Sequence, residues 1–275
     1  HSRLRLQNTN GFLKEVLFMT EGPSAKYKAL RIMNAVGGDI LQNIYVKGGK
    51  IGVNPRGLLG KKLQRTETFG KNIVLVFNGY AIKIHLMMYG TIHIYGLDEK
   101  LAKPEEEVRL ILKFPNKRVV VYNTPVIEID YASKIIKKLK KTLGEDPLRD
   151  DWDPSRAVKL IMKNRDRKIG DVLLDQRVIA GVGNIIRNEV LFRARIHPER
   201  LVRDLKLEEV EKLVRIIKDF MEEFFKRRLR GERLRPVLYV YNRSGKPCVI
   251  CGHPIKYYRQ KPNNRKTFVC ENCQR

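Results

Sequence analysis

Four cysteines near the carboxyl end of the sequence form two Cys-x-x-Cys pairs. Cys248 and Cys251 form the first pair, and Cys270 and Cys273 follow after eighteen intervening residues. Two such pairs at this separation are typical of a tetrahedral Zn²⁺ ion with four thiolate ligands, each pair holding the metal from a tight turn. We predict a structural zinc site on a β-hairpin, because four protein ligands leave no open position for water.

Other interpretations of these cysteines remain open. Two disulfides would use the same four residues, but nothing in the sequence indicates secretion, and the rest of the chain has no cysteine. His253 could replace one thiolate, although with four thiols available we expect it to be a bystander. The segment between the pairs mixes basic and aromatic residues, which suits contact with phosphates but also a solvated hairpin tip. These residues are Lys256, Tyr257, Tyr258, Arg259, Lys261, Arg265, Lys266 and Phe268.

A glycine-rich turn in the middle of the chain could bind an anion. Gly181 and Gly183 precede Asn184, where we expect a helix to begin after an earlier helix that carries residues 173–176 and ends near Val178. Glycines permit a sharp turn, and a helix start presents free N–H groups and a positive dipole end that suit a phosphate. The side chain of Asn184 adds a donor. An ordinary helix–helix corner would have the same pattern, so this motif alone does not decide.

The composition points to a polyanionic partner. The 275 residues include 56 Lys and Arg against 30 Asp and Glu, which gives a net charge of +26 and a pI of about 10.0. Such charge favours nucleic acid, although a merely soluble, lysine-rich protein of a heat-loving organism would also have it. No stretch approaches the roughly 18–20 apolar residues of a membrane helix. The first eighteen residues lack the apolar core of a signal peptide, so we predict a cytoplasmic protein without membrane contact.

The hydrophobic pattern predicts an α+β protein with several domains. A helix from Pro23 to Gly37 is followed, up to about residue 129, by short strands with turns at 78–79 and 115–116. We expect these strands to form an antiparallel β-sandwich or barrel. Helical periodicity follows, including an apolar stripe over 210–225 that we assign to core packing. The zinc hairpin completes the chain.

Four motifs resemble one known family. The pattern Asp-Gln-x4-Gly-x-Gly-Asn-Ile-x3-Glu-x-Leu-Phe at 175–192 resembles the helix-two-turns-helix signature of the formamidopyrimidine-DNA glycosylase and endonuclease VIII family. Residues 19–23 resemble its catalytic N-terminus, residues 66–71 its active-site lysine hairpin, and residues 245–274 its zinc finger. The motifs occur in the family's order from about residue 19 to the last residue, which makes coincidence improbable.

The resemblance implies a base-excision-repair enzyme with DNA glycosylase and AP-lyase activity. In this family a damaged base is flipped out and excised, and an N-terminal α-amine, usually of proline, forms a Schiff base with the sugar before the strand is cut. By position, Thr20 would be the nucleophile, Glu21 the general acid and Lys71 an assisting cation. Singly, Glu21 could be an ordinary first-turn helix acid and Lys71 a hairpin cation.

The same resemblance implies the contacts with DNA. Asn184 and Arg265 would hold the phosphates around the flipped nucleotide. Met88, with Met87 and Tyr89 beside it, occupies the position of the wedge that fills the vacated stack, although these methionines could also be strand core. The chain lacks the Arg-Arg-Phe loop of the formamidopyrimidine branch and looks more like endonuclease VIII. This favours oxidised pyrimidines over 8-oxoguanine, in double-stranded DNA with oxidised or abasic lesions. We expect a monomer of prokaryotic type that associates with the nucleoid.

Three departures from the family pattern bear on the mechanism. Thr20 replaces the catalytic proline, and as a terminal residue it would still offer a primary amine. Residues 1–18 precede this motif, and we predict that they are a non-native or mis-annotated extension and that Met19 is the true start. If they are present, Lys71 is the fallback nucleophile. Ser24 stands where the family has a second acid.

These observations give a domain organisation and two competing functions. We expect a catalytic β-sandwich domain at 19–131, a helix-two-turns-helix domain at 132–236 and a four-cysteine zinc finger at 237–275. The first alternative to the enzyme is a binder of damaged or abasic DNA that lost its nucleophile. The second is a zinc-containing protein that binds RNA or the ribosome.

Overall fold

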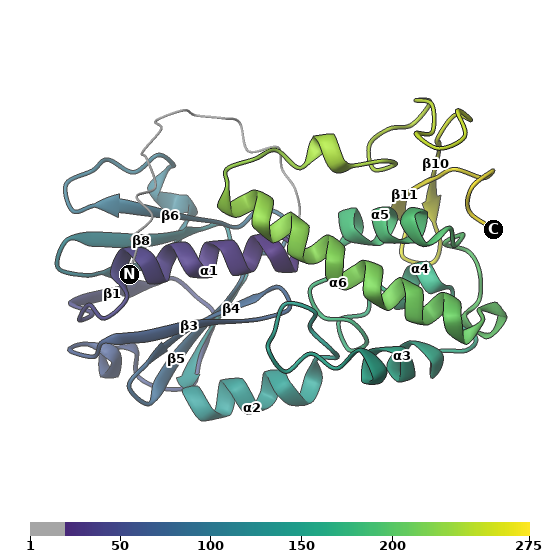
Figure 1. The fold of residues 1–275 in the computed structure, drawn as a ribbon. Coiled ribbons are helices and arrows are strands. Elements are labelled where there is room, and N and C mark those ends of the chain that lie inside the picture. Colours follow the sequence, from purple (N-terminus) through teal and green to yellow (C-terminus); the bar gives the residue numbers. More distant parts are fainter. Residues whose placement is uncertain (1–19) are drawn as a thin grey trace, which may run out of the picture.

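The computed structural model describes residues 20–275, and the predicted extension at 1–18 lies outside these residues (Figure 1). The first half of the chain folds into two facing sheets. One sheet has the strand order β1-β7-β8-β6 and the other the order β2-β9-β5-β4-β3. The strands are β1 (Asn43–Val46), β2 (Lys50–Ile51), β3 (Leu63–Phe69), β4 (Asn72–Phe77), β5 (Tyr80–His85), β6 (Thr91–Gly96), β7 (Val108–Lys113), β8 (Lys117–Tyr122) and β9 (Val126–Tyr131).

Apolar side chains from both sheets meet in one core. Ile73 and Leu75 of one sheet pack with Leu110 and Val121 of the other, and Ile32 of helix α1 (Gly22–Val36) lies in the same cluster. Strand β7 alternates between buried and partly exposed residues, as expected for a sheet with one covered face, whereas β4 is buried almost throughout. Helix α2 (Ala132–Thr142) covers the second face of β4. The predicted β-sandwich with a leading helix is therefore confirmed.

One strand pair departs from the predicted antiparallel arrangement. Strand β2 runs parallel to β9, with Lys50 opposite Glu128 and Ile51 opposite Ile129. The remaining pairs of the two sheets are antiparallel. A two-residue strand leaves too little hydrophobic pattern for its direction to be predicted from sequence.

The helical half of the molecule is built around the longest helix (Figure 1). Its helices are α3 (Pro154–Met162), α4 (Ile169–Val172), α5 (Asn184–Ala194) and α6 (Leu207–Leu229). The apolar stripe of α6 is buried against α3 and α5, which confirms its assignment to core packing. Helix α1 also packs against α6, so it joins the sandwich to the helical half.

The prediction that residues 173–178 form a helix is wrong. Helix α4 ends at Val172, and the following residues form successive turns in which Asp175 accepts the backbone N–H of Arg177 at 3.0 Å. An aspartate that bonds its own backbone competes with helical hydrogen bonds, which explains the early end. The helix predicted to begin at Asn184 is confirmed.

The chain ends in the predicted hairpin of β10 (Lys256–Gln260) and β11 (Arg265–Val269). Short 3-10 helices lie at Pro55–Leu58, Glu105–Glu107, Val202–Asp204 and Arg235–Val237. The three domain boundaries stay predictions, and α2, placed after the first boundary, packs on the five-stranded sheet. Within residues 20–275, no helix has both the length and the apolar character needed to cross a membrane.

Candidate active site and nucleic-acid interface

Glu21 joins the start of α1 to the start of α5. Its Oε1 accepts the backbone N–H of Ile185 at 2.7 Å, and its Oε2 accepts that of Ile186 at 3.2 Å. The side chain is buried, with 1% of the residue exposed. A Cβ atom at Gly183 would lie 2.5 Å from the Glu21 carboxyl carbon, so any larger residue there would displace this carboxyl group. The glycine turn thus holds a carboxyl group at the helix N-terminus, and that group belongs to Glu21.

Lys71 interacts electrostatically with Glu21, and burial shifts the pKa of both groups. Burial raises the pKa of Glu21, against the opposing effects of the Lys71 charge and of the backbone N–H donors. Burial lowers the pKa of Lys71, Glu21 opposes this shift, and the positive charge of Arg265 adds to it. The proton affinities of the acid and the amine therefore approach one another, as acid–base chemistry near neutral pH requires.

The hairpin that carries Lys71 packs against the glycine turn. Lys71 follows Gly70 in the β3–β4 turn, and Gly70 has a φ of +58°. A Cβ at Gly70 would lie 2.9 Å from the backbone nitrogen of Gly181. The N–H of Gly22 donates to the Gly181 carbonyl at 2.8 Å. Three glycines thus let the start of α1, the lysine hairpin and the turn before α5 meet at backbone distance.

Thr20 lies beside an exposed apolar turn. Its backbone N–H donates to the carbonyl of Met87 at 3.4 Å. Met87, Met88 and Tyr89 are 47%, 50% and 62% exposed in the connection between β5 and β6. The alternative that these methionines belong to the strand core is therefore wrong. Three exposed apolar side chains thus follow one another in the turn whose backbone contacts Thr20, and their role as a wedge stays a prediction.

Asn184 and Arg265 come together where α5 meets the C-terminal hairpin. The Asn184 amide donates to the carbonyl of Lys266 at 2.8 Å, and Lys266 directly follows Arg265 in β11. The positive charge of Arg265 also interacts with Lys71 and lowers the pKa of that amine. Glu21, Lys71, Asn184 and Arg265 thus lie in one region of the structure, and the roles that the resemblance implies for them stay predictions.

Sequence reasoning did not predict that two charged residues of α5 anchor the C-terminal part of the chain, Arg187 the hairpin and Glu189 the segment 239–241 that precedes it. Arg187 is fully buried, and its guanidinium donates to Gln260 Oε1 at 2.7 Å and Thr267 Oγ1 at 2.6 Å. The Glu189 carboxylate accepts the backbone N–H groups of residues 239, 240 and 241 at 2.8–2.9 Å. Charged residues on a helix that is buried on most sides are rarely left unpaired, and that signal could have identified them.

The four cysteines gather at the base of the hairpin. Their Sγ atoms all lie within 4.8 Å of one another. Cys248 and Cys273 have sulfurs 3.8 Å apart, and the sulfurs of Cys251 and Cys270 are 3.4 Å apart. These distances exceed the roughly 2.05 Å of a disulfide bond. Thiolates around a tetrahedral Zn²⁺, with Zn–S bonds of about 2.3 Å, would lie about 3.8 Å apart, so the cluster fits such a metal.

Comparisons with known proteins agree with this arrangement. The formamidopyrimidine-DNA glycosylase N-terminal domain matches residues 19–125, and the H2TH domain of the same glycosylase matches residues 143–233. Endonuclease 8 1 of Mycobacterium tuberculosis is 33% identical over 242 residues, which cover 82% of this chain and 89% of that protein. The chain belongs to the formamidopyrimidine-DNA glycosylase and endonuclease VIII family.

Other relatives extend the comparison. Human endonuclease 8-like 3 is 33% identical over 212 residues, and this match spans 76% of the chain but 34% of the human protein. The solved complex of Lactococcus lactis Fpg with abasic-site DNA has the same fold, with a TM-score of 0.82, 23% identity, and coverage of 92% of this chain and 99% of that one. Family members are bifunctional DNA glycosylases and AP lyases of base excision repair, and the predicted enzyme class is confirmed at that level.

Proposed function

We propose that this chain removes oxidised pyrimidines from double-stranded DNA and cuts the strand through a Schiff-base intermediate. The observation that carries the proposal is the pairing of Glu21 and Lys71 at the N-terminus of α5. A buried carboxyl of raised pKa and a buried amine of lowered pKa lie in mutual electrostatic contact, with the charge of Arg265 beside them. Such a pair supplies a proton donor and an amine in one site.

In this proposal the amine attacks the sugar and Glu21 supplies a proton. The nitrogen bonds to C1′ as the glycosidic bond breaks and the base departs with the electron pair, and the proton that the attached amine loses neutralises the base. Glu21 donates its proton to the ring oxygen O4′ as the ring opens. The iminium that forms draws electrons from C2′, whose proton is lost, and the 3′ phosphate leaves. Thr20 supplies the amine when it is the first residue, and Lys71 supplies it when Thr20 is in peptide linkage.

We propose that the remaining site residues bind and distort the DNA. Asn184 and Arg265 contact the phosphates around the flipped nucleotide. Their position beside the N-terminus of α5 supports this role. Met88, flanked by Met87 and Tyr89, fills the space that the flipped base leaves in the stack. The chain's net charge of +26 supports association with DNA at the nucleoid.

We propose that Zn²⁺ is the metal of the cysteine cluster. Cys248, Cys251, Cys270 and Cys273 would hold it, and the thiolate set and sulfur spacing support this choice over harder metals. The ion would stabilise the hairpin on which Arg265 lies and would take no part in the reaction.

Excision from two lesions tests the proposed substrate. We expect single-turnover release of thymine glycol to be at least about tenfold faster than release of 8-oxoguanine from matched duplexes. Equal rates, or faster release of 8-oxoguanine, would contradict the pyrimidine assignment. No release of either base, together with tight binding, would instead support the damaged-DNA binder.

A further inference from the structure

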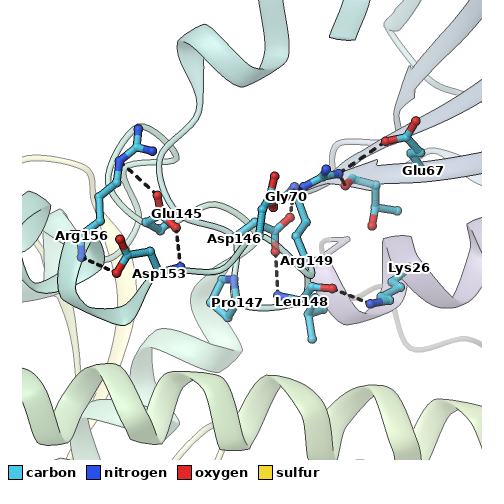
Figure 2. A network of polar contacts seen from close by, with 12 residues as sticks. Lys26, Glu67, Gly70, Glu145, Asp146, Pro147, Leu148, Arg149, Asp153 and Arg156 are labelled. Atoms are coloured by element: carbon cyan, nitrogen blue, oxygen red, sulfur yellow. Dashed lines mark hydrogen bonds and ion pairs between the residues drawn. The ribbon is translucent and has the colours of Figure 1, made fainter. Parts of the chain in front are cut away.

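The segment between α2 and α3, residues 144–153, bonds to both halves of the molecule, and we call it the linker strap (Figure 2). Lys26 of α1 donates to the carbonyl of Leu148, and Lys218 of α6 donates to that of Pro147 at 2.6 Å. Arg149 donates to the carbonyl of Thr68 in β3 at 3.0 Å. The strap therefore has a fixed place against α1, α6 and β3.

Asp146 is the strap residue that contacts the lysine hairpin. Its Oδ2 accepts the backbone N–H of Gly70 at 2.7 Å, and its Oδ1 accepts that of Leu148 at 3.0 Å (Figure 2). The carboxylate is buried, and Gly70 directly precedes Lys71. A carboxylate from 76 residues away thus holds the backbone from which Lys71 projects.

The residue before Asp146 bonds to the chain that leads into the glycine turn. The Glu145 N–H donates to Val178 O at 3.2 Å, and the Glu145 carbonyl accepts the N–H of Ala180 at 2.8 Å. Ala180 immediately precedes the turn that ends at Asn184, where α5 begins, and α5 holds Glu21. Two consecutive strap residues therefore connect the support of Lys71 with the support of Glu21.

We propose that Asp146 is a positioning residue that fixes the Lys71 hairpin relative to the helix terminus that holds Glu21. This inference rests on the proposed function. Burial raises the pKa of Asp146, and the N–H groups of Gly70 and Leu148, with the charges of Arg149 and Lys26, oppose that shift. A carboxylate accepts through both oxygens, whereas a carboxamide has one acceptor and one donor group. Asparagine at this position therefore leaves one buried N–H facing another donor.

The test compares Asp146→Asn with Asp150→Asn, an exposed aspartate of the same strap. With an abasic duplex, we expect Asp146→Asn to lower the single-turnover lyase rate by about tenfold to a hundredfold. Its Kd for a duplex with a tetrahydrofuran abasic analogue should stay within about twofold of the unmodified chain. Hydrogen exchange of the Gly70 amide should accelerate, and the pH profile of the rate should move. Asp150→Asn should change none of these quantities.

The outcomes separate this inference from the proposed function. An unmodified chain without lyase activity would contradict the proposed function. An active chain whose rate and Gly70 exchange are unaffected by Asp146→Asn would overturn the positioning role alone, as would losses of rate and affinity in parallel. If Asp146→Asn does not fold, Asp146→Glu keeps both acceptors on a longer arm. It should also be slower at unchanged Kd, and a rate equal to that of the unmodified chain would overturn the proposal.

Discussion

At the scale of residues, the site depends on two buried groups whose proton affinities shift in opposite directions. Burial keeps Glu21 protonated to higher pH than a free glutamic acid, and it keeps Lys71 neutral to lower pH than a free lysine. The backbone N–H groups of α5 partly oppose the first shift, and the Lys71 charge does so as well. The pKa values of the acid and the amine therefore lie closer together than those of the free side chains.

Glu21→Gln tests this pairing through the pH dependence of the lyase rate. We expect the rate to fall about 10²–10⁴-fold, because glutamine cannot donate the proton that opens the sugar ring. The unmodified chain should lose activity as pH rises through the raised pKa of Glu21, and this alkaline limb should be missing in the variant. Glu208→Gln, at an exposed acid in the first turn of α6, is the matched control and should behave as the unmodified chain.

The same shift predicts a change in stability with pH. Because the folded pKa of Glu21 is raised, the folded state binds the proton more tightly than the unfolded state. The stabilisation is fully present below the unfolded value of about 4.5 and is lost as pH rises through the folded pKa. As pH rises over this range, the Tm of Glu21→Gln should therefore increase relative to the Tm of the unmodified chain. A Tm difference that does not vary with pH would contradict the shift.

At the scale of elements, α5 organises both the chemistry and the interface. Its N-terminus holds Glu21, its middle holds the hairpin through Arg187, and Phe192 packs in the cluster that contains Cys248 and Cys270. The hairpin in turn gives Asn184 its acceptor at Lys266. The cysteine cluster therefore acts on the site through the backbone of β11.

Cys248→Ser tests whether the cysteine cluster supports the interface. The variant should lose its bound Zn²⁺ and, because the hairpin then loses its fixed fold, should bind abasic DNA at least about tenfold more weakly. Metal content and Kd are the measurements. His253→Ala is the matched control, since we expect His253 to be a bystander, and it should retain both. Retained zinc and affinity in Cys248→Ser would refute the assignment of four thiolate ligands.

At the scale of the whole molecule, local sequence patterns predicted helices, turns and the cysteine cluster. They did not predict the contacts between residues far apart in the chain. The turn at 78–79, the cysteine spacing and the apolar stripe of α6 are local, and the structure confirms the elements that they predicted. The family's motif order predicted that Glu21, Lys71 and Arg265 share a region. The support of Lys71 by Asp146 joins residues 76 positions apart, and that of the hairpin by Arg187 joins residues 80 apart. No periodicity or spacing encodes such pairs, so they emerge only in the folded chain.

Borohydride trapping on an abasic duplex identifies the nucleophilic amine in chains that begin at Thr20 and at His1. Reduction converts a Schiff base into a stable covalent adduct, and peptide mapping then identifies the amine. We predict an adduct at the Thr20 α-amine in the first chain and at Lys71 in the second. Tight binding of the duplex by both chains without any covalent adduct would contradict the Schiff-base mechanism.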